Sequence, residues 1–272
     1  MVDTSLLLLP FFQRALVVGL VLGVVMAILG VIVVLRHMSF FADAIGHSAL
    51  TGIALGILLQ LNPFVSALVY SLLVATGIAI VKRKSNLSMD TLLGVFFSAS
   101  VAIGVILIQL TPGYQTDLIG FLFGDILTVS NVDVILAISI AVITGVILIF
   151  TGKTFIIIAF DASLAQAEGT SVAWYELILL LILASVIALA IKLLGIILVT
   201  AMLVIPAASA HNITRSLTAM FATSALLSII AVTTGMLASA ATNTASGPTI
   251  ILVSALLFAL SLLVKPLIKS SS

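Results

Sequence analysis

The chain has 272 residues, of which 63% are hydrophobic and 7% charged, with a mean hydropathy of +1.47. A soluble domain carries about 25% charged residues, so this chain could not cover its surface with polar groups. The net charge of +1 gives no electrostatic reason to expect nucleic acid as a partner, and the absence of cysteine excludes disulfides and thiolate metal sites.

Apolar runs long enough to cross a bilayer, about 20 residues each, recur along the whole chain. A β-barrel would instead need alternating segments of about ten residues. The first run is expected to be retained, because the residues before it lack the basic region of a signal peptide. The sequence predicts an all-α, polytopic transmembrane helix bundle that forms a single domain over 1–272. We expect nine spans, with eight or ten as alternatives: 11–35, 42–60, 63–81, 91–110, 132–151, 173–191, 193–211, 216–239 and 248–266.

Basic residues favour one orientation of these spans. Placing the N-terminus outside leaves only Arg14 and Lys192 on the outer side and eight basic residues in the cytoplasm, which is the bias that membrane proteins follow. The C-terminus is then cytoplasmic. This layout requires a very tight turn at Lys192 and leaves 116–128 as a short re-entrant or interfacial helix. The eight cytoplasmic residues are Arg36, Lys82, Arg83, Lys84, Lys153, Arg215, Lys265 and Lys269.

Two ionisable residues, Asp43 and His47, stand four positions apart where the second span begins. A helix stacks them on one face, one turn apart. Ionisable groups inside a span are costly and usually face a cavity or a partner. Carboxylate and imidazole suit a divalent ion such as zinc or manganese, and two ligands alone would hold it weakly enough to let it leave. The alternative is that Asp43 caps the span and His47 hydrogen-bonds a carbonyl.

Other ionisable residues lie near the ends of the spans. His37 and His211 are expected at the membrane interface, and Glu176 either pairs with Lys153 or faces the cytoplasm. Three acidic residues on the outer side attract cations or belong to a solvated loop: Asp117, Asp125 and Asp133.

The cytoplasmic connection 153–171 contains helix formers bounded by Asp161 or Ser163 as N-cap and Gly169 as C-cap. These signals predict a helix of about two turns, too short to cross a membrane. Phe160 and Leu164 beside small residues give a surface that could dock into a groove of a partner, and a solvated connecting helix is the alternative. The small residues are Ala162, Ala165 and Ala167.

Pro206 lies inside an apolar span and is expected to kink its helix, because proline removes one backbone hydrogen bond. The small residues that follow, 207–210, allow a neighbouring helix to approach closely. The chain has no metalloprotease, phosphate-loop or nucleophile-elbow motif, so enzyme signatures are absent.

Five segments resemble, in order, the signature blocks of the transmembrane permease subunit of bacterial ABC importers for zinc, manganese or iron. Together they extend over nearly the whole chain. The segments are LRHMSFFADAIGHSALTGIALG (35–56), LFGDILTVS (122–130), AFDASLAQAEG (159–169), LGIILVTAMLVIPAASA (194–210) and SGPTIIL (246–252).

The resemblance implies a permease in the bacterial plasma membrane, paired with a second copy of itself or a related permease. It also implies two cytoplasmic ATPase subunits, which would hydrolyse the ATP, and an extracytoplasmic metal-binding protein. The permease itself would be no enzyme and would bind no stable cofactor, since the divalent ion is its cargo. Asp43 and His47 match the family's acid and histidine on the metal route. The 160–169 segment matches the coupling helix that docks on the ATPase, with Phe160, Asp161, Leu164, Ala165 and Gly169.

Three segments resemble zinc permeases more than manganese ones, so zinc is the favoured cargo: 122–130, the surroundings of Lys192, and 246–248. Asn243 stands where zinc-type relatives often have an acidic residue shortly before the Gly-Pro pair, a departure that counts against zinc if that residue helps to receive the ion. The alternatives are a secondary cation transporter driven by an ion gradient, an ABC permease for siderophores or cobalamin, and an intramembrane hydrolase.

Overall fold

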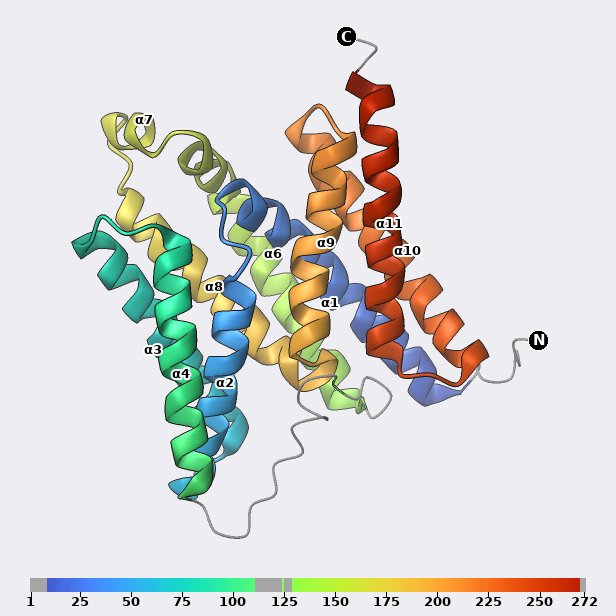
Figure 1. The fold of residues 1–272 in the computed structure, drawn as a ribbon, viewed down its shortest axis with the longest axis horizontal. Coiled ribbons are helices and arrows are strands. Elements are labelled where there is room, and N and C mark those ends of the chain that lie inside the picture. Colours follow the sequence, from blue (N-terminus) through green and yellow to red (C-terminus); the bar gives the residue numbers. More distant parts are fainter. Residues whose placement is uncertain (1–8, 111–123, 125–128, 270–272) are drawn as a thin grey trace. The chain divides into compact units, whose positions relative to one another are not determined.

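The computed structural model describes residues 9–110, 124 and 129–269. In these ranges every regular element is a helix (Figure 1). Nine of the helices are long and apolar enough to cross a membrane, which confirms the all-α bundle and the expected number of spans for this part of the chain. The helices are α1 (Pro10–Leu35), α2 (Phe41–Leu58), α3 (Pro63–Lys84), α4 (Met89–Gln109), α6 (Asn131–Phe160), α7 (Ala162–Ala167), α8 (Val172–Leu194), α9 (Ile196–Ile213), α10 (Leu217–Thr242) and α11 (Ser246–Lys269).

Side-chain caps fix where several helices begin. Asn62 precedes Pro63, and its Oδ1 accepts the backbone N–H groups of Phe64 and Val65 at 3.0 and 3.3 Å. Ser88 caps α4 and Ser216 caps α10 in the same way. Each cap satisfies N–H groups that the helix itself leaves without partners, so these residues fix where the helices begin.

Two features of the spans differ from the sequence-based expectation. The tight turn between α8 and α9 lies at Gly195, not at Lys192, because the turn needs a positive φ (80°) that glycine adopts without strain. Lys192 remains inside α8, with its Nζ 5.4 Å from the centre of the Phe64 ring. The fifth span, α6, has 30 residues rather than ending near 151. At 1.5 Å per residue it is about 45 Å long, so it is longer than the roughly 30 Å hydrocarbon layer and carries Lys153 within it.

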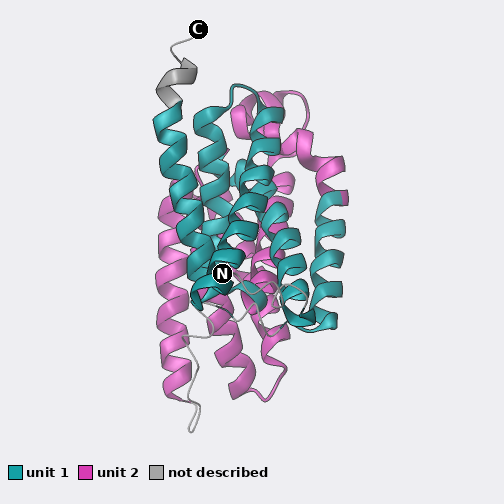
Figure 2. Cartoon of the chain, turned by 90° about the vertical axis from the view of Figure 1, so that its right-hand side faces the viewer, with its two compact units in different colours: residues 1–34, 122–145, 193–272 teal, residues 35–121, 146–192 magenta. Residues whose placement is uncertain are grey.

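The chain forms two compact units (Figure 2). Unit 1 comprises 1–34, 122–145 and 193–272, and unit 2 comprises 35–121 and 146–192. Helix α6 contributes its first half to unit 1 and its second half to unit 2. The predicted orientation of the termini across the membrane stays a prediction.

Small residues allow close helix packing inside each unit. In unit 1, an added Cβ on Gly30 of α1 would lie 1.8 Å from the carbonyl oxygen of Leu203 in α9. In unit 2, an added Cβ on Gly52 of α2 would lie 2.7 Å from the Cα of Ala67 in α3. Such contacts let backbones approach within van der Waals distance, the packing mode that dominates in membranes.

Most of segment 116–128 lies outside the described residues, so the expected re-entrant helix and the roles of Asp117 and Asp125 stay predictions. Gly124 is described and has a φ of +68°. A Cβ at this position would lie 2.4 Å from the carbonyl carbon of Leu194. Within unit 1, Gly124 therefore lies directly against the turn between α8 and α9.

Candidate functional site

Asp43 and His47 lie at the beginning of α2, where the helix forms without a side-chain cap. Phe40 occupies the N-cap position and makes no cap hydrogen bond, while the Phe41 N–H donates to the Met38 carbonyl at 2.9 Å. Asp43 is the acidic residue of the first turn, where the helix dipole favours a negative charge. The N-cap position itself belongs to Phe40, and the capping alternative raised from the sequence stays a prediction.

The two side chains face a cavity of about 430 Å³ inside unit 2. Both are half-buried. The cavity lies between the first turns of α2 and those of α4, the ends at which both helices begin. Its lining residues are Phe40, Asp43, His47, Asp90, Leu93, Gly94, Phe97 and Ser98. The spacing of Asp43 and His47 therefore has the consequence expected from the sequence: both groups point into a protein cavity.

Helix α4 contributes five lining residues that the sequence did not point to, and two of them, Asp90 and Phe97, bear on the chemistry of the cavity. Asp90 is an exposed carboxylate in the first turn of α4. Phe97 places its ring edge-on against the His47 imidazole, with the ring centres 4.8 Å apart and an interplanar angle of 82°. Asp90, Gly94 and Phe97 recur at positions i, i+4 and i+7, so helical spacing could have placed them on one face.

Asp43 and His47 do not by themselves form a complete metal-binding site. Among the residues that the structure describes, no three histidine, cysteine or acidic side chains come close enough together to hold a metal ion. Asp43 and His47 could supply two ligands from one helix face, with the remaining coordination left to water or a mobile group. An ion held in this way would exchange readily, as a translocation route requires.

The polar side chains behind His47 join α2 to α4. Ser48 Oγ donates to the Ala44 carbonyl at 2.6 Å and lies 3.0 Å from Ser100 Oγ, and Thr51 Oγ1 donates to the Ser100 carbonyl at 2.6 Å. Ser48, Thr51 and Ser100 are buried. These bonds hold the His47 face of α2 in register with the Phe97 face of α4.

Helix α7 is shorter than the 160–169 segment expected from the sequence. Phe160 is the last residue of α6, because Asp161 adopts an extended conformation and begins a new helix. Asp161 Oδ1 accepts the N–H groups of Ser163 and Leu164 at 2.9 and 3.0 Å. The hydrogen bond from Leu164, followed by those from Ser163, lowers the pKa of the Asp161 carboxyl below its ordinary value. Asp161 is therefore the N-cap, one of the two residues predicted.

The end of α7 closes in a Schellman motif. Gly169 has a φ of +85°, its N–H donates to the Gln166 carbonyl at 3.0 Å, and the Thr170 N–H donates to the Ala165 carbonyl at 3.0 Å. Gly169 thus ends the helix as predicted.

The surface of α7 and the end of α6 is apolar and open. Phe160 is 66% exposed and Leu164 53% exposed, whereas Ala165 is buried. Two large exposed hydrophobic side chains beside a capped, two-turn helix are consistent with a docking surface.

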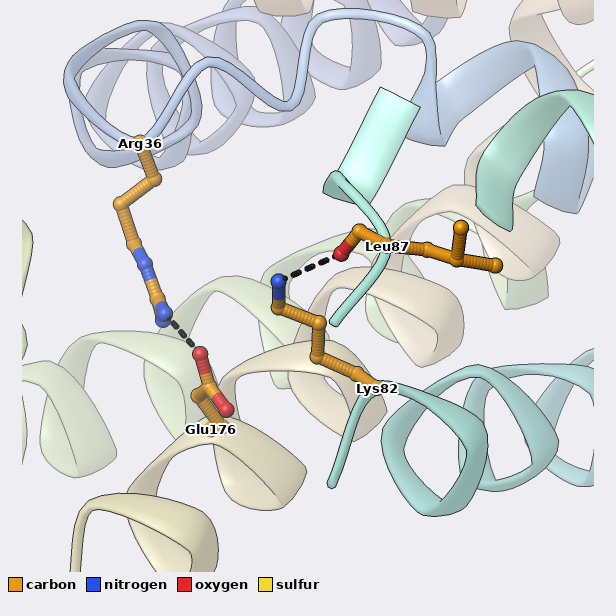
Figure 3. Close-up of polar contacts among 4 residues, drawn as sticks. All are labelled: Arg36, Lys82, Leu87 and Glu176. Atoms are coloured by element: carbon orange, nitrogen blue, oxygen red, sulfur yellow. Dashed lines mark hydrogen bonds and ion pairs between the residues drawn. The ribbon is translucent and has the colours of Figure 1, made fainter. Parts of the chain in front are cut away.

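Glu176, in α8, forms an ion pair with Arg36, which directly follows α1, and not with Lys153 (Figure 3). Both partners belong to unit 2. His37 and His211 are exposed at helix ends, and the structure brings neither to the cavity.

Asp133 has a structural role at the start of α6. Its Oδ2 accepts the N–H and the Oγ–H of Ser130 at 3.1 and 2.6 Å, and Ser130 Oγ accepts the Asp133 N–H at 3.3 Å. This reciprocal arrangement caps the helix, and Asp133 is buried, so it is not part of a solvated loop.

Helix α9 continues through Pro206, which is buried. The expected kink at this residue stays a prediction. Asn243 ends α10 in the left-handed conformation, with a φ of 53°, and its N–H donates to the Ser239 carbonyl. Asparagine tolerates this conformation well, which gives this position a local structural reason for its residue type.

Comparison with known proteins shows the family. The model of the ABC 3 transport family matches residues 8–265. The high-affinity zinc uptake system membrane protein ZnuB of Haemophilus influenzae is 36% identical over 249 residues, which cover 91% of this chain and 95% of that protein. The manganese import system permease protein ScaB of Streptococcus gordonii is 36% identical over 256 residues, which cover 94% of this chain and 92% of that protein.

A solved structure has the same fold. PsaBC from Streptococcus pneumoniae, determined in complex with Fab, matches with a TM-score of 0.80 and 35% sequence identity over 93% of this chain and 91% of that one. The match covers nearly the full length of both chains. The chain therefore belongs to the ABC 3 transport family, as a multi-pass permease of the bacterial cell membrane.

Proposed function

We propose that the chain is the membrane-spanning subunit of an ATP-driven importer that moves a divalent transition-metal ion into the cytoplasm, with zinc as the favoured ion. The observation that carries this proposal is the pair Asp43 and His47, which faces a cavity in a chain that is 63% hydrophobic and only 7% charged. A carboxylate and an imidazole are costly in such surroundings unless a cation or water compensates them.

Asp43 and His47 act as transient ligands on the metal route. Phe97 restricts the rotation of the imidazole, and Asp90 adds a negative charge at the same cavity. The ion exchanges its ligands as it moves because the site supplies too few of them for tight binding.

Partner proteins supply the energy and the ion for transport. The exposed surface of Phe160 and Leu164 docks on a cytoplasmic ATPase subunit, and an extracytoplasmic metal-binding protein delivers the ion. A second permease copy completes the assembly. Closure of the ATPase pair on ATP moves α7, and the bundle alternates between outward and inward access, with Pro206 as a point of bending in α9. The chain itself binds no stable cofactor.

The choice of zinc rests on sequence blocks and on the imidazole ligand, which zinc prefers more strongly than manganese does. Relatives named for zinc and for manganese are equally similar, at 36% identity each. The uptake of both ions therefore has to be measured side by side.

The test is metal accumulation in a bacterial strain that lacks the gene, complemented with wild type, Asp43→Asn or His47→Ala. His211→Ala is the matched control, because His211 is exposed at the end of α9 and does not line the cavity. Wild type and His211→Ala should restore zinc uptake, and the two cavity variants should reduce it at least fivefold. Equal accumulation in wild type and His47→Ala would contradict the proposed route. Uptake that persists without the ATPase gene would instead favour a transporter driven by an ion gradient.

A further inference from the structure

The ion pair between Arg36 and Glu176 connects the two segments of unit 2 to which the proposed function gives a role. Arg36 lies five residues before α2, the helix that carries Asp43 and His47. Glu176 lies in the first two turns of α8, the helix that follows α7. The side chains meet across 140 positions of sequence, as Figure 3 shows.

This contact is shielded from solvent. The side chains of Arg36 and Glu176 are only 11% and 18% exposed. Two opposite charges attract each other more strongly in such a place, because the local dielectric constant is lower than at a free surface. Loss of one partner leaves the other charge buried and uncompensated. The pair is therefore a firm connection between the two segments.

The segment between Arg36 and α2 is short and packed. Met38 and Phe41 are almost completely buried, and the Phe41 N–H donates to the Met38 carbonyl. His37 adopts the left-handed conformation, with a φ of 52°, which turns the chain sharply after Arg36. A displacement of Arg36 would therefore be passed to the first turn of α2 rather than absorbed by a loose loop.

The segment between α7 and Glu176 is equally continuous. The Schellman motif at Gly169 leads directly to hydrogen bonds from Val172 to Thr170 and from Trp174 and Tyr175 to Ser171. The Tyr175 ring packs edge-on against the buried ring of Phe155 in α6, with ring centres 6.2 Å apart. The end of α6, α7 and the start of α8 thus form one connected piece of unit 2.

We propose that Arg36 and Glu176 are positioning residues for coupled transport: their ion pair passes the movement of α7 to the start of α2 and so to Asp43 and His47. This inference rests on the proposed function, because it assigns a mechanical link between the ATPase-docking helix and the metal ligands. Neither residue contacts the ion in this account.

The test uses the complete importer, with its ATPase and binding protein, in proteoliposomes. Zinc uptake and ATP hydrolysis are measured together for wild type, Arg36→Gln, Glu176→Gln, Arg36→Lys and the charge swap Arg36→Glu/Glu176→Arg. Lys82→Gln is the matched control, because the Lys82 ammonium donates to the Leu87 carbonyl in the same region without joining the two segments (Figure 3).

The two single neutral variants should keep ATP hydrolysis within twofold of wild type and lose at least fivefold in zinc transported per ATP. Arg36→Lys and the charge swap should each recover at least half of the wild-type ratio, and Lys82→Gln should leave it unchanged. A structural defect alone would lower hydrolysis and uptake together.

An unchanged ratio in Arg36→Gln and Glu176→Gln would overturn the inference. If the neutral variants do not assemble, Arg36→Lys and the charge swap decide, and failure of both to support coupled uptake would overturn it as well. A wild-type complex that hydrolyses ATP without zinc or manganese uptake would instead contradict the proposed function itself.

Discussion

The packing of α1 against α9 in unit 1 predicts that Gly30→Ala is strongly destabilising. The added Cβ would lie 1.8 Å from the Leu203 carbonyl oxygen, 2.9 Å from its carbon and 3.3 Å from the Ala207 Cβ. Ordinary carbon–oxygen contact needs more than 3 Å, so the two backbones would have to separate by about 1 Å, and no side-chain rotation can relieve the overlap. Overpacking of this kind costs about 1–3 kcal/mol, and occasionally more.

The control for this prediction is Gly145→Ala, in α6. A Cβ at Gly145 would meet nothing within 4 Å, so the substitution should only add the helical preference of alanine, about 0.5–1 kcal/mol in favour of the folded state. The free energy of unfolding, measured by denaturant titration in mixed micelles, should be lower for Gly30→Ala and equal or higher for Gly145→Ala. Equal unfolding free energies for the two variants would refute the packing of α1 on α9.

Three further predictions concern the cavity and α7. Phe97→Leu removes the edge-on contact with His47, worth about 0.5–1.5 kcal/mol, and should raise the zinc concentration for half-maximal uptake roughly two- to tenfold; an unchanged value would contradict the positioning of the imidazole. Because the pKa of Asp161 is lowered in the folded chain, its cap is fully present above the ordinary carboxyl pKa of about 3.9 and is lost as the pH falls through the lowered value. The emission of Trp174, the single tryptophan, should therefore stay constant from neutral pH to about pH 5 and change only below about pH 4, and Asp161→Asn should abolish that change. Leu164→Ser should weaken co-purification with the ATPase subunit, whereas Gln166→Ala, an exposed polar position of the same helix, should not; equal losses would argue against the apolar docking surface.

Much of the bundle follows from local physics that a sequence displays directly. The long apolar runs predicted the nine candidate spans found in the described part of the chain, because the hydrocarbon layer demands about 20 apolar residues from each crossing. Asp161 and Gly169 marked the ends of α7 for reasons confined to a few neighbouring residues: a side-chain acceptor for free N–H groups, and a positive φ. Such signals do not depend on the rest of the fold.

The features that were missed depend on contacts between segments distant in sequence. Phe97 contacts His47 because α4 packs against α2. Glu176 pairs with Arg36 rather than with Lys153 because the start of α8 lies beside the segment that follows α1. The length of α6 was also missed, since its last two turns are apolar enough to continue a helix but lie beyond the thickness of a membrane. Single-sequence patterns predict the elements and their ends, whereas the partners of a half-buried charge require the tertiary structure.

The most direct test of the account is ATP-driven metal uptake by proteoliposomes that contain the complete importer, with zinc and manganese supplied separately on the binding-protein side. Uptake should require ATP and fall at least fivefold when His47→Ala or Asp43→Asn replaces the wild-type chain, while His211→Ala should transport normally. Full ATP-driven uptake by both cavity variants would contradict the claim that the ion passes Asp43 and His47.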